Sequence, residues 1–109
     1  MIIKFSPSKY ATPGTPDTPG RGKLADAELH FSGGPLNGLR LIGFAVTQRD
    51  GIRDVSFPSR QYSVNGDRRT IALLQPISNH QDQHLRDLIL LAFAEFESEL
   101  AHIASEVVG

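Results

Sequence analysis

Apolar and polar residues alternate over several short stretches in the first two thirds of the chain. Ala27, Leu29 and Phe31 fall on one side of an extended segment, whereas Glu28 and His30 fall on the other. This period of two is typical of a strand that is buried on one face only. Similar stretches recur, and the predicted strands are residues 24–31, 39–47, 52–57 and 70–74.

Turn residues between these stretches indicate that neighbouring strands are antiparallel. Asp50-Gly51 and Asn65-Gly66 suit tight hairpin turns, in which both central residues have positive φ. Because sequential strands usually lie side by side, the predicted sheet is a four-stranded antiparallel meander in chain order. It becomes five-stranded if residues 1–5 add a short edge strand.

Two residues interrupt the predicted strands. Pro58 lacks the amide donor that a central ladder requires, so the third predicted strand should stop before it. Gly43 lies where the apolar residues of the second predicted strand change phase, and a β-bulge is expected there.

The last third of the chain has the spacing of one long helix. Ser78 is the expected N-cap, with Gln81 completing a capping box. Apolar residues surround nearly the whole helix from residue 88 to residue 94, and this exceeds the stripe of about 100° that one sheet would cover. We therefore expect the helix to pack on the sheet and also to form the interface of a homodimer. The overall class is α+β.

The N-terminal region differs in composition from the rest. Residues 6–22 contain four prolines among Gly, Ser and Thr, which predicts an extended arm or linker. The chain therefore divides into a strand and arm at residues 1–23 and a domain at residues 24–109. No apolar run approaches the ~20 residues of a membrane span, and no secretory segment is evident, so a cytoplasmic protein without membrane contact is expected.

Little in the sequence points to catalysis or to a cofactor. The chain has no cysteine, so thiolate metal sites and cysteine nucleophiles are excluded. His80 and His84 share a helix face, but zinc sites need three or four ligands. Phosphate-binding loops and a nucleophile elbow are also absent. We expect no enzyme activity, no metal and no cofactor.

Charge is distributed unevenly along the chain. Residues 1–75 have a net charge of +4 and residues 76–109 a net charge of -5. Arginine suits phosphate because its planar group forms paired hydrogen bonds, and Tyr62 could add a stacking surface. The alternative is that arginines keep sheet edges and turns soluble. The candidate nucleic-acid-binding residues are Arg49, Arg53, Arg60, Arg68 and Arg69.

Several short motifs occur in a fixed order: FPSR at residues 57–60, GDRR at residues 66–69 and PI at residues 76–77, followed by the helix. In this arrangement residues 27–97 resemble the septation protein SpoVG family of bacteria. The resemblance implies a small homodimer that binds DNA or RNA and regulates gene expression, with Arg60 and Arg69 as phosphate contacts.

Two other kinds of function are compatible with the sequence. A protein–protein adaptor or scaffold would use a sheet edge or the proline-rich arm, and the near-neutral net charge of -1 favours it. A small-molecule sensor would need a pocket between sheet and helix, for which the sequence offers no polar cluster.

Overall fold

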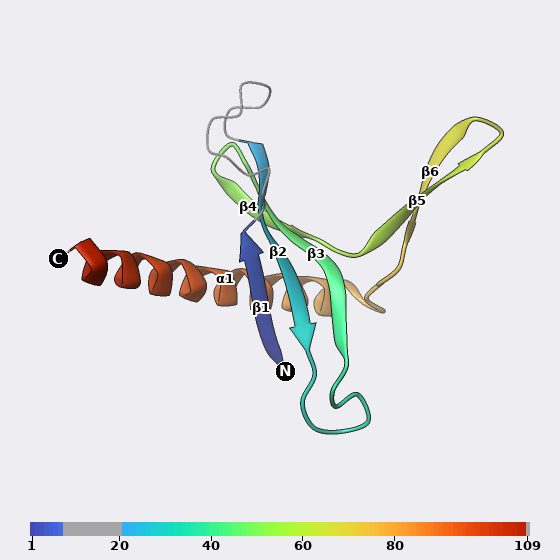
Figure 1. Ribbon diagram of the computed structural model, residues 1–109. Helices are drawn as coiled ribbons and strands as arrows, with labels where there is room; N and C mark the ends of the chain where they lie inside the picture. The colour runs from blue at the N-terminus through green and yellow to red at the C-terminus, as the bar shows by residue number, and fades with distance from the viewer. Residues whose placement is uncertain (8–20, 109) are drawn as a thin grey trace.

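The computed structural model describes the backbone of residues 1–7 and 21–108 and the side chains of residues 1–6 and 22–102. Its main sheet has four antiparallel strands in chain order, as predicted (Figure 1). The strands are β1 (Ile2–Pro7), β2 (Arg21–His30), β3 (Arg40–Arg49) and β4 (Ile52–Ser56). The edge strand expected at the N-terminus is therefore present. Most of the proline-rich arm lies outside the described residues.

The remaining strands form a separate two-stranded sheet. β5 (Ser59–Val64) pairs with β6 (Asp67–Ala72), and the resulting hairpin extends away from the main sheet (Figure 1). The segment predicted at residues 70–74 as the fourth strand of the meander thus contributes to β6 instead. Pro58 ends the ladder of β4, and the chain then turns away and pairs locally. The α+β class and the four-stranded sheet are confirmed, with β1 in the place expected for this segment.

Both structural interruptions predicted from the sequence are present. β4 ends two residues before Pro58. In the ladder between β2 and β3, Ala27 pairs with Phe44 and Leu29 with Leu41, so two residues of β3 lie opposite one residue of β2. This bulge includes Gly43, whose φ is +104°. It brings Leu41 and Phe44 to the same face of the sheet although they are three residues apart.

The C-terminal helix α1 (Asn79–Val108) packs across one face of the main sheet. Its N-cap is Ser78, whose Oγ accepts a hydrogen bond of 3.2 Å from the backbone N–H of Gln81. Ile89 and Phe93 lie one turn apart on α1 and are buried against the sheet. The buried core consists of Ala25, Ala27, Leu29, Phe44, Val46, Val55, Ile89 and Phe93.

Candidate nucleic-acid interface

The β5–β6 hairpin has two chemically different faces. Its turn is formed by Asn65 and Gly66, with φ of +52° and +83°, and these values match the predicted turn. Residues directly opposite each other in an antiparallel pair lie on one face. Tyr62 pairs with Arg69, and Arg60 pairs with Ile71. Val64 pairs with Asp67 on the same side. We call this side the Tyr62 face; it combines two arginines, one aspartate, a tyrosine and apolar groups.

Arg68 lies on the other side of the hairpin. It pairs with Ser63, and the neighbouring pair on that face is Gln61 with Thr70. Side chains alternate along a strand, so adjacent residues such as Arg68 and Arg69 point in opposite directions. The structure therefore groups two of the three hairpin arginines and separates the third.

The hairpin arginines form no ion pairs within the described part of the chain, although Asp67 lies on the same face as Arg60 and Arg69. Every residue of β5 and β6 is exposed. None of the ion pairs among the described residues includes Arg60, Arg68 or Arg69. Exposed guanidinium groups in this state can form paired hydrogen bonds to a phosphate without first breaking an ion pair.

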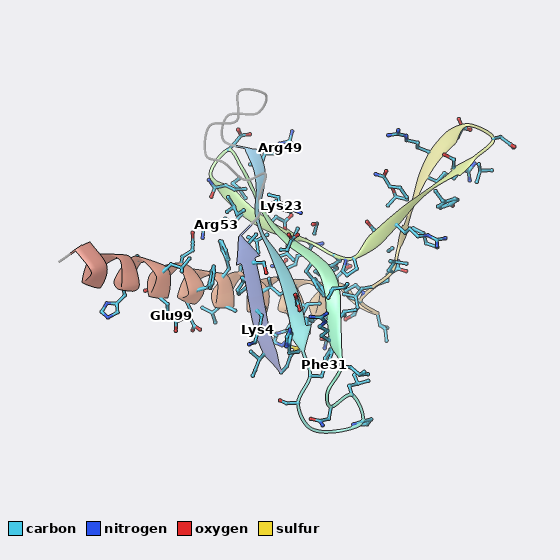
Figure 2. The ribbon with its side chains drawn as sticks, in the orientation of Figure 1. Lys4, Lys23, Phe31, Arg49, Arg53 and Glu99 are labelled. Atoms are coloured by element: carbon cyan, nitrogen blue, oxygen red, sulfur yellow. The ribbon has the colours of Figure 1, made fainter. Side chains whose placement is uncertain are left out.

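Arg49 lies apart from the hairpin, at the end of β3 (Figure 2). It is exposed and precedes the turn formed by Asp50 and Gly51. Across the β2–β3 ladder its partner is Arg21, a pairing that inspection of the sequence did not anticipate. This end of the main sheet therefore has a second basic position, contributed by the first residue of β2.

Arg53 has a different environment from the other four candidates. Its Nη2 donates a hydrogen bond of 2.8 Å to Glu97 Oε2 on α1, and its Nη1 contacts the other carboxylate oxygen. The guanidinium also lies 5.2 Å from the centroid of the Phe93 ring. Hydrogen bonding to Glu97 raises the pKa of Arg53, and partial burial opposes this effect. Arg53 thus links β4 to α1.

Arg86 is a prominent arginine that the sequence patterns did not single out. Residues 76–109 contain no other Lys or Arg, and Arg86 follows Asp82 by four residues. Its Nε donates a hydrogen bond of 2.6 Å to Asp82 Oδ1, and its Nη1 donates one of 2.8 Å to Asp54 Oδ1. A lone cation in an acidic helix was a usable signal, but its contact with β4 was not predictable from spacing.

The two helix histidines do not belong to a metal-binding cluster in the described structure. The rings of His80 and His84 are stacked with centroids 6.4 Å apart. No group of three or more His, Cys, Asp or Glu residues within the described part of the chain could hold a metal ion.

Among the described residues, no helix has the length and apolar character needed to cross a bilayer.

An open groove lies between α1 and β1, the edge strand of the main sheet. Its volume is about 480 Å³, and its walls include Ile2, Leu88 and Leu91. Leu91 is 62% exposed and Ile2 is 55% exposed. Glu95 and Glu99 also line the groove. Part of the apolar surface predicted beyond one face of the helix is therefore exposed, at Leu91, whereas Leu88 and Leu90 are half-buried.

Comparison with known proteins adds no assignment, because no protein-family model, curated protein or solved structure matches this chain. The structure leaves the SpoVG resemblance neither supported nor contradicted.

Proposed function

We propose that this chain is a cytoplasmic, non-catalytic regulatory protein that binds DNA or RNA as a homodimer. The observation that carries the proposal is the Tyr62 face of the hairpin. Arg60, Arg69 and Tyr62 lie together there, exposed and without intramolecular ion pairs among the described residues. These are also the two arginines that the SpoVG resemblance implies as phosphate contacts.

The chemistry of this face suits a single-stranded or unpaired segment. Arginine binds the phosphate backbone, and an aromatic ring stacks on a base without regard to sequence. Tyr62 lies directly opposite Arg69. The base of one nucleotide could therefore stack on Tyr62 while its phosphate binds Arg69. Arg68 on the opposite face and Arg49 on the main sheet would contribute more weakly through general electrostatic attraction.

The test is fluorescence anisotropy with labelled single-stranded DNA, single-stranded RNA and duplex DNA of about 20 nucleotides at several salt concentrations. In the Arg60→Ala, Arg69→Ala double variant, we expect weaker binding to every probe. The slope of log K against log salt should fall by about 0.7–0.9 for each phosphate contact that is lost. Tyr62→Ala should weaken single-stranded binding by about 1–3 kcal/mol and affect duplex binding less.

A matched control removes the same number of charges elsewhere. Lys4 and Lys23 are exposed on β1 and β2, and the Lys4→Ala, Lys23→Ala double variant should retain most of the affinity. Equal losses in the two double variants would show that only net charge matters and would contradict the assignment to the Tyr62 face. Absence of binding by the wild-type protein at ~10⁻⁵ M in low salt would refute nucleic-acid binding altogether.

The groove between β1 and α1 supports the homodimer part of the proposal. An exposed apolar stripe on a helix gains stability when a second copy removes it from water. We expect light scattering after gel filtration to give twice the chain mass of 11.9 kDa. Leu91→Ser should shift the protein toward monomer, whereas Leu100→Ser makes the same chemical change outside the groove. A wild-type monomer at micromolar concentration would exclude this dimer.

Protein–protein docking is a second candidate, favoured by the apolar groups of the Tyr62 face. Val64 and Ile71 lie on that face and are 39% and 48% exposed. Nucleic-acid binding uses such aliphatic groups little, whereas protein interfaces bury them. A Val64→Ser, Ile71→Ser variant should then lose a protein partner that survives nuclease treatment. If that variant instead retains every partner, the adaptor function does not involve this face.

A further inference from the structure

The orientation of the β5–β6 hairpin depends on a small joint. β5 and β6 pack mainly against each other, and neither has an extensive interface with the main sheet or α1 in the described structure. The chain enters the hairpin through Phe57 and Pro58 and leaves it near Leu73. The backbone N–H of Leu73 donates a hydrogen bond of 2.9 Å to the carbonyl of Pro58, which joins the two connections.

The entering side of the joint is packed into the main sheet. The Phe57 ring lies edge-to-face with the buried Phe44 ring, with centroids 5.8 Å apart. Pro58 is buried and seated against the bulge in β3, where a Cβ added to Gly43 would lie 3.1 Å from Pro58 Cβ. These contacts place the start of the hairpin relative to β3.

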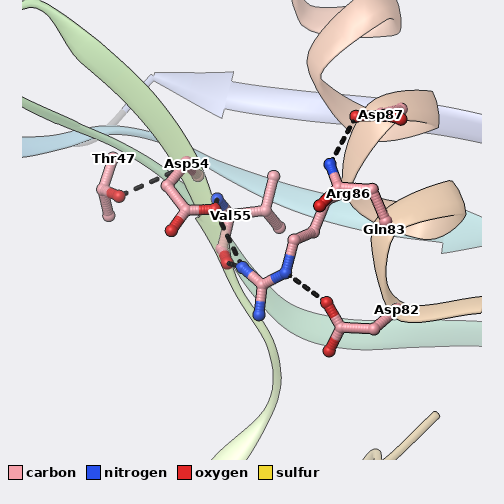
Figure 3. Close-up of polar contacts among 7 residues, drawn as sticks. All are labelled: Thr47, Asp54, Val55, Asp82, Gln83, Arg86 and Asp87. Atoms are coloured by element: carbon pink, nitrogen blue, oxygen red, sulfur yellow. Dashed lines mark hydrogen bonds and ion pairs between the residues drawn. The ribbon is translucent and has the colours of Figure 1, made fainter. Parts of the chain in front are cut away.

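Arg86 reaches from α1 to β4 next to the joint, where it contacts Asp54 and Val55 (Figure 3). Its guanidinium carbon lies 4.5 Å from the centroid of the Phe57 ring. The same group donates hydrogen bonds to Asp82 on its own helix and, on β4, to Asp54 and the carbonyl oxygen of Val55. One side chain therefore connects α1, β4 and the first residue of the connection to the hairpin.

We propose that Arg86 is a positioning residue for the Tyr62 face. By stacking on Phe57 and joining β4 to α1, it fixes the direction in which the hairpin presents Arg60 and Arg69. Restricting that direction before binding reduces the ordering cost of binding. What the hairpin binds rests on the proposed function, whereas its orientation is a property of the joint alone.

The experiment measures hairpin orientation in the absence of nucleic acid. The chain has no cysteine, so nitroxide labels can be placed at Ser63→Cys on the hairpin and Ala94→Cys on α1. A second pair, Ser6→Cys with Ala94→Cys, reports on the body of the protein. Pulsed electron–electron double resonance gives the distance distribution for each pair, with excess unlabelled protein added to suppress distances between copies.

We expect Arg86→Ala to broaden the hairpin-to-helix distribution and to leave the body distribution unchanged. Arg53→Ala is the matched control, because Arg53 also joins β4 to α1 through a carboxylate and an aromatic ring but lies away from the joint. It should broaden neither distribution. Arg86→Lys, which keeps the charge and loses the planar stack on Phe57, should broaden the hairpin distribution less than Arg86→Ala.

Several results would overturn this role. One is a hairpin distribution in Arg86→Ala as narrow as in the wild type, and another is equal broadening of both pairs, which indicates general loosening. If Arg86→Ala does not fold, an unchanged hairpin distribution in Arg86→Lys refutes the role instead. Arg86→Ala should also weaken nucleic-acid binding without reducing its salt slope, because the Arg86 guanidinium is held by Asp82 and Asp54 and is not part of the Tyr62 face. If the wild type fails to bind nucleic acid, the function fails and the distance result still stands.

Discussion

The contact between Gly43 and Pro58 gives the most direct test of the joint, through the substitution Gly43→Ala. Gly43 has a φ of +104°, in a region that residues with a Cβ rarely occupy. Its added Cβ would lie 3.1 Å from Pro58 Cβ and 3.3 Å from Pro58 Cγ. Pro58 is a rigid, buried neighbour, so either the bulge in β3 or the joint must shift.

The magnitude follows from three contributions. Holding a residue with a Cβ at this φ costs about 1–3 kcal/mol. The close contact with Pro58 adds about 1–3 kcal/mol, the range for overpacking of a well-packed site. Loss of glycine flexibility in the unfolded chain offsets about 0.4–1 kcal/mol. The free energy of unfolding should therefore fall by about 1–5 kcal/mol, with about 3 kcal/mol at the centre of the range, and the melting temperature by about 4–8 °C per kcal/mol for a chain of this size.

Urea and thermal denaturation followed by circular dichroism measure this change at a fixed protein concentration. Gly38→Ala is the matched control, because Gly38 has a φ of +86° and nothing lies within 4 Å of an added Cβ. It should show the backbone strain, less the same unfolded-chain offset, and no contact cost. The difference between the two variants isolates the contact with Pro58. Equal destabilisation in the two variants would refute the reasoning.

Three further predictions concern individual contacts. In a double-mutant cycle, Arg53→Ala and Glu97→Ala should couple by only about 0.5–1 kcal/mol, because both side chains are more than a third exposed and water screens their charges. A coupling energy that stays unchanged in high salt would contradict this argument. Ser78→Ala should lower stability in urea denaturation by about 1 kcal/mol and Ser78→Asp by much less, and equal effects would argue against the N-cap bond. Asn65→Val should destabilise the hairpin by about 1–2 kcal/mol, because a β-branched residue resists the φ of +52°. Amide hydrogen exchange in β5 and β6 should be faster in Asn65→Val than in the wild type, whereas Asn65→Gly should exchange at nearly the wild-type rate. Unchanged exchange in Asn65→Val would contradict this prediction.

Local chemistry by itself determined much of the fold. Both hairpin turns occur where an Asp-Gly or Asn-Gly dipeptide stands, and Asp50 and Asn65 have the positive φ that such turns require. The helix begins after Ser78, whose hydroxyl caps it. The bulge at Gly43 and the end of β4 before Pro58 were also predictable. The turns and the helix cap depend on interactions within a few residues of sequence, and the positions of the bulge and of the strand end are marked by a single glycine and a single proline.

The candidate site depended partly on contacts that sequence patterns do not contain. Tyr62 faces Arg69 and Arg68 lies on the opposite face because the Asn65-Gly66 turn sets the register of the hairpin, a local signal that inspection of the sequence did not use. Arg53 meets a carboxylate on α1 that is 44 residues away. From charge placement alone these arginines were members of one basic group, and only the SpoVG resemblance singled out Arg60 and Arg69.

Only the tertiary structure decided where the hairpin belongs and which arginines it presents. Propensity and turn residues specify strands, but they do not specify which ladder a strand joins, because that choice depends on packing between distant segments. Here Pro58 stops β4 and packs on Gly43, so the next two strands pair with each other away from the main sheet. The same packing places the Phe57 ring against the Arg86 guanidinium. Arg86 is also held by Asp82, which lies one helix turn before it on α1.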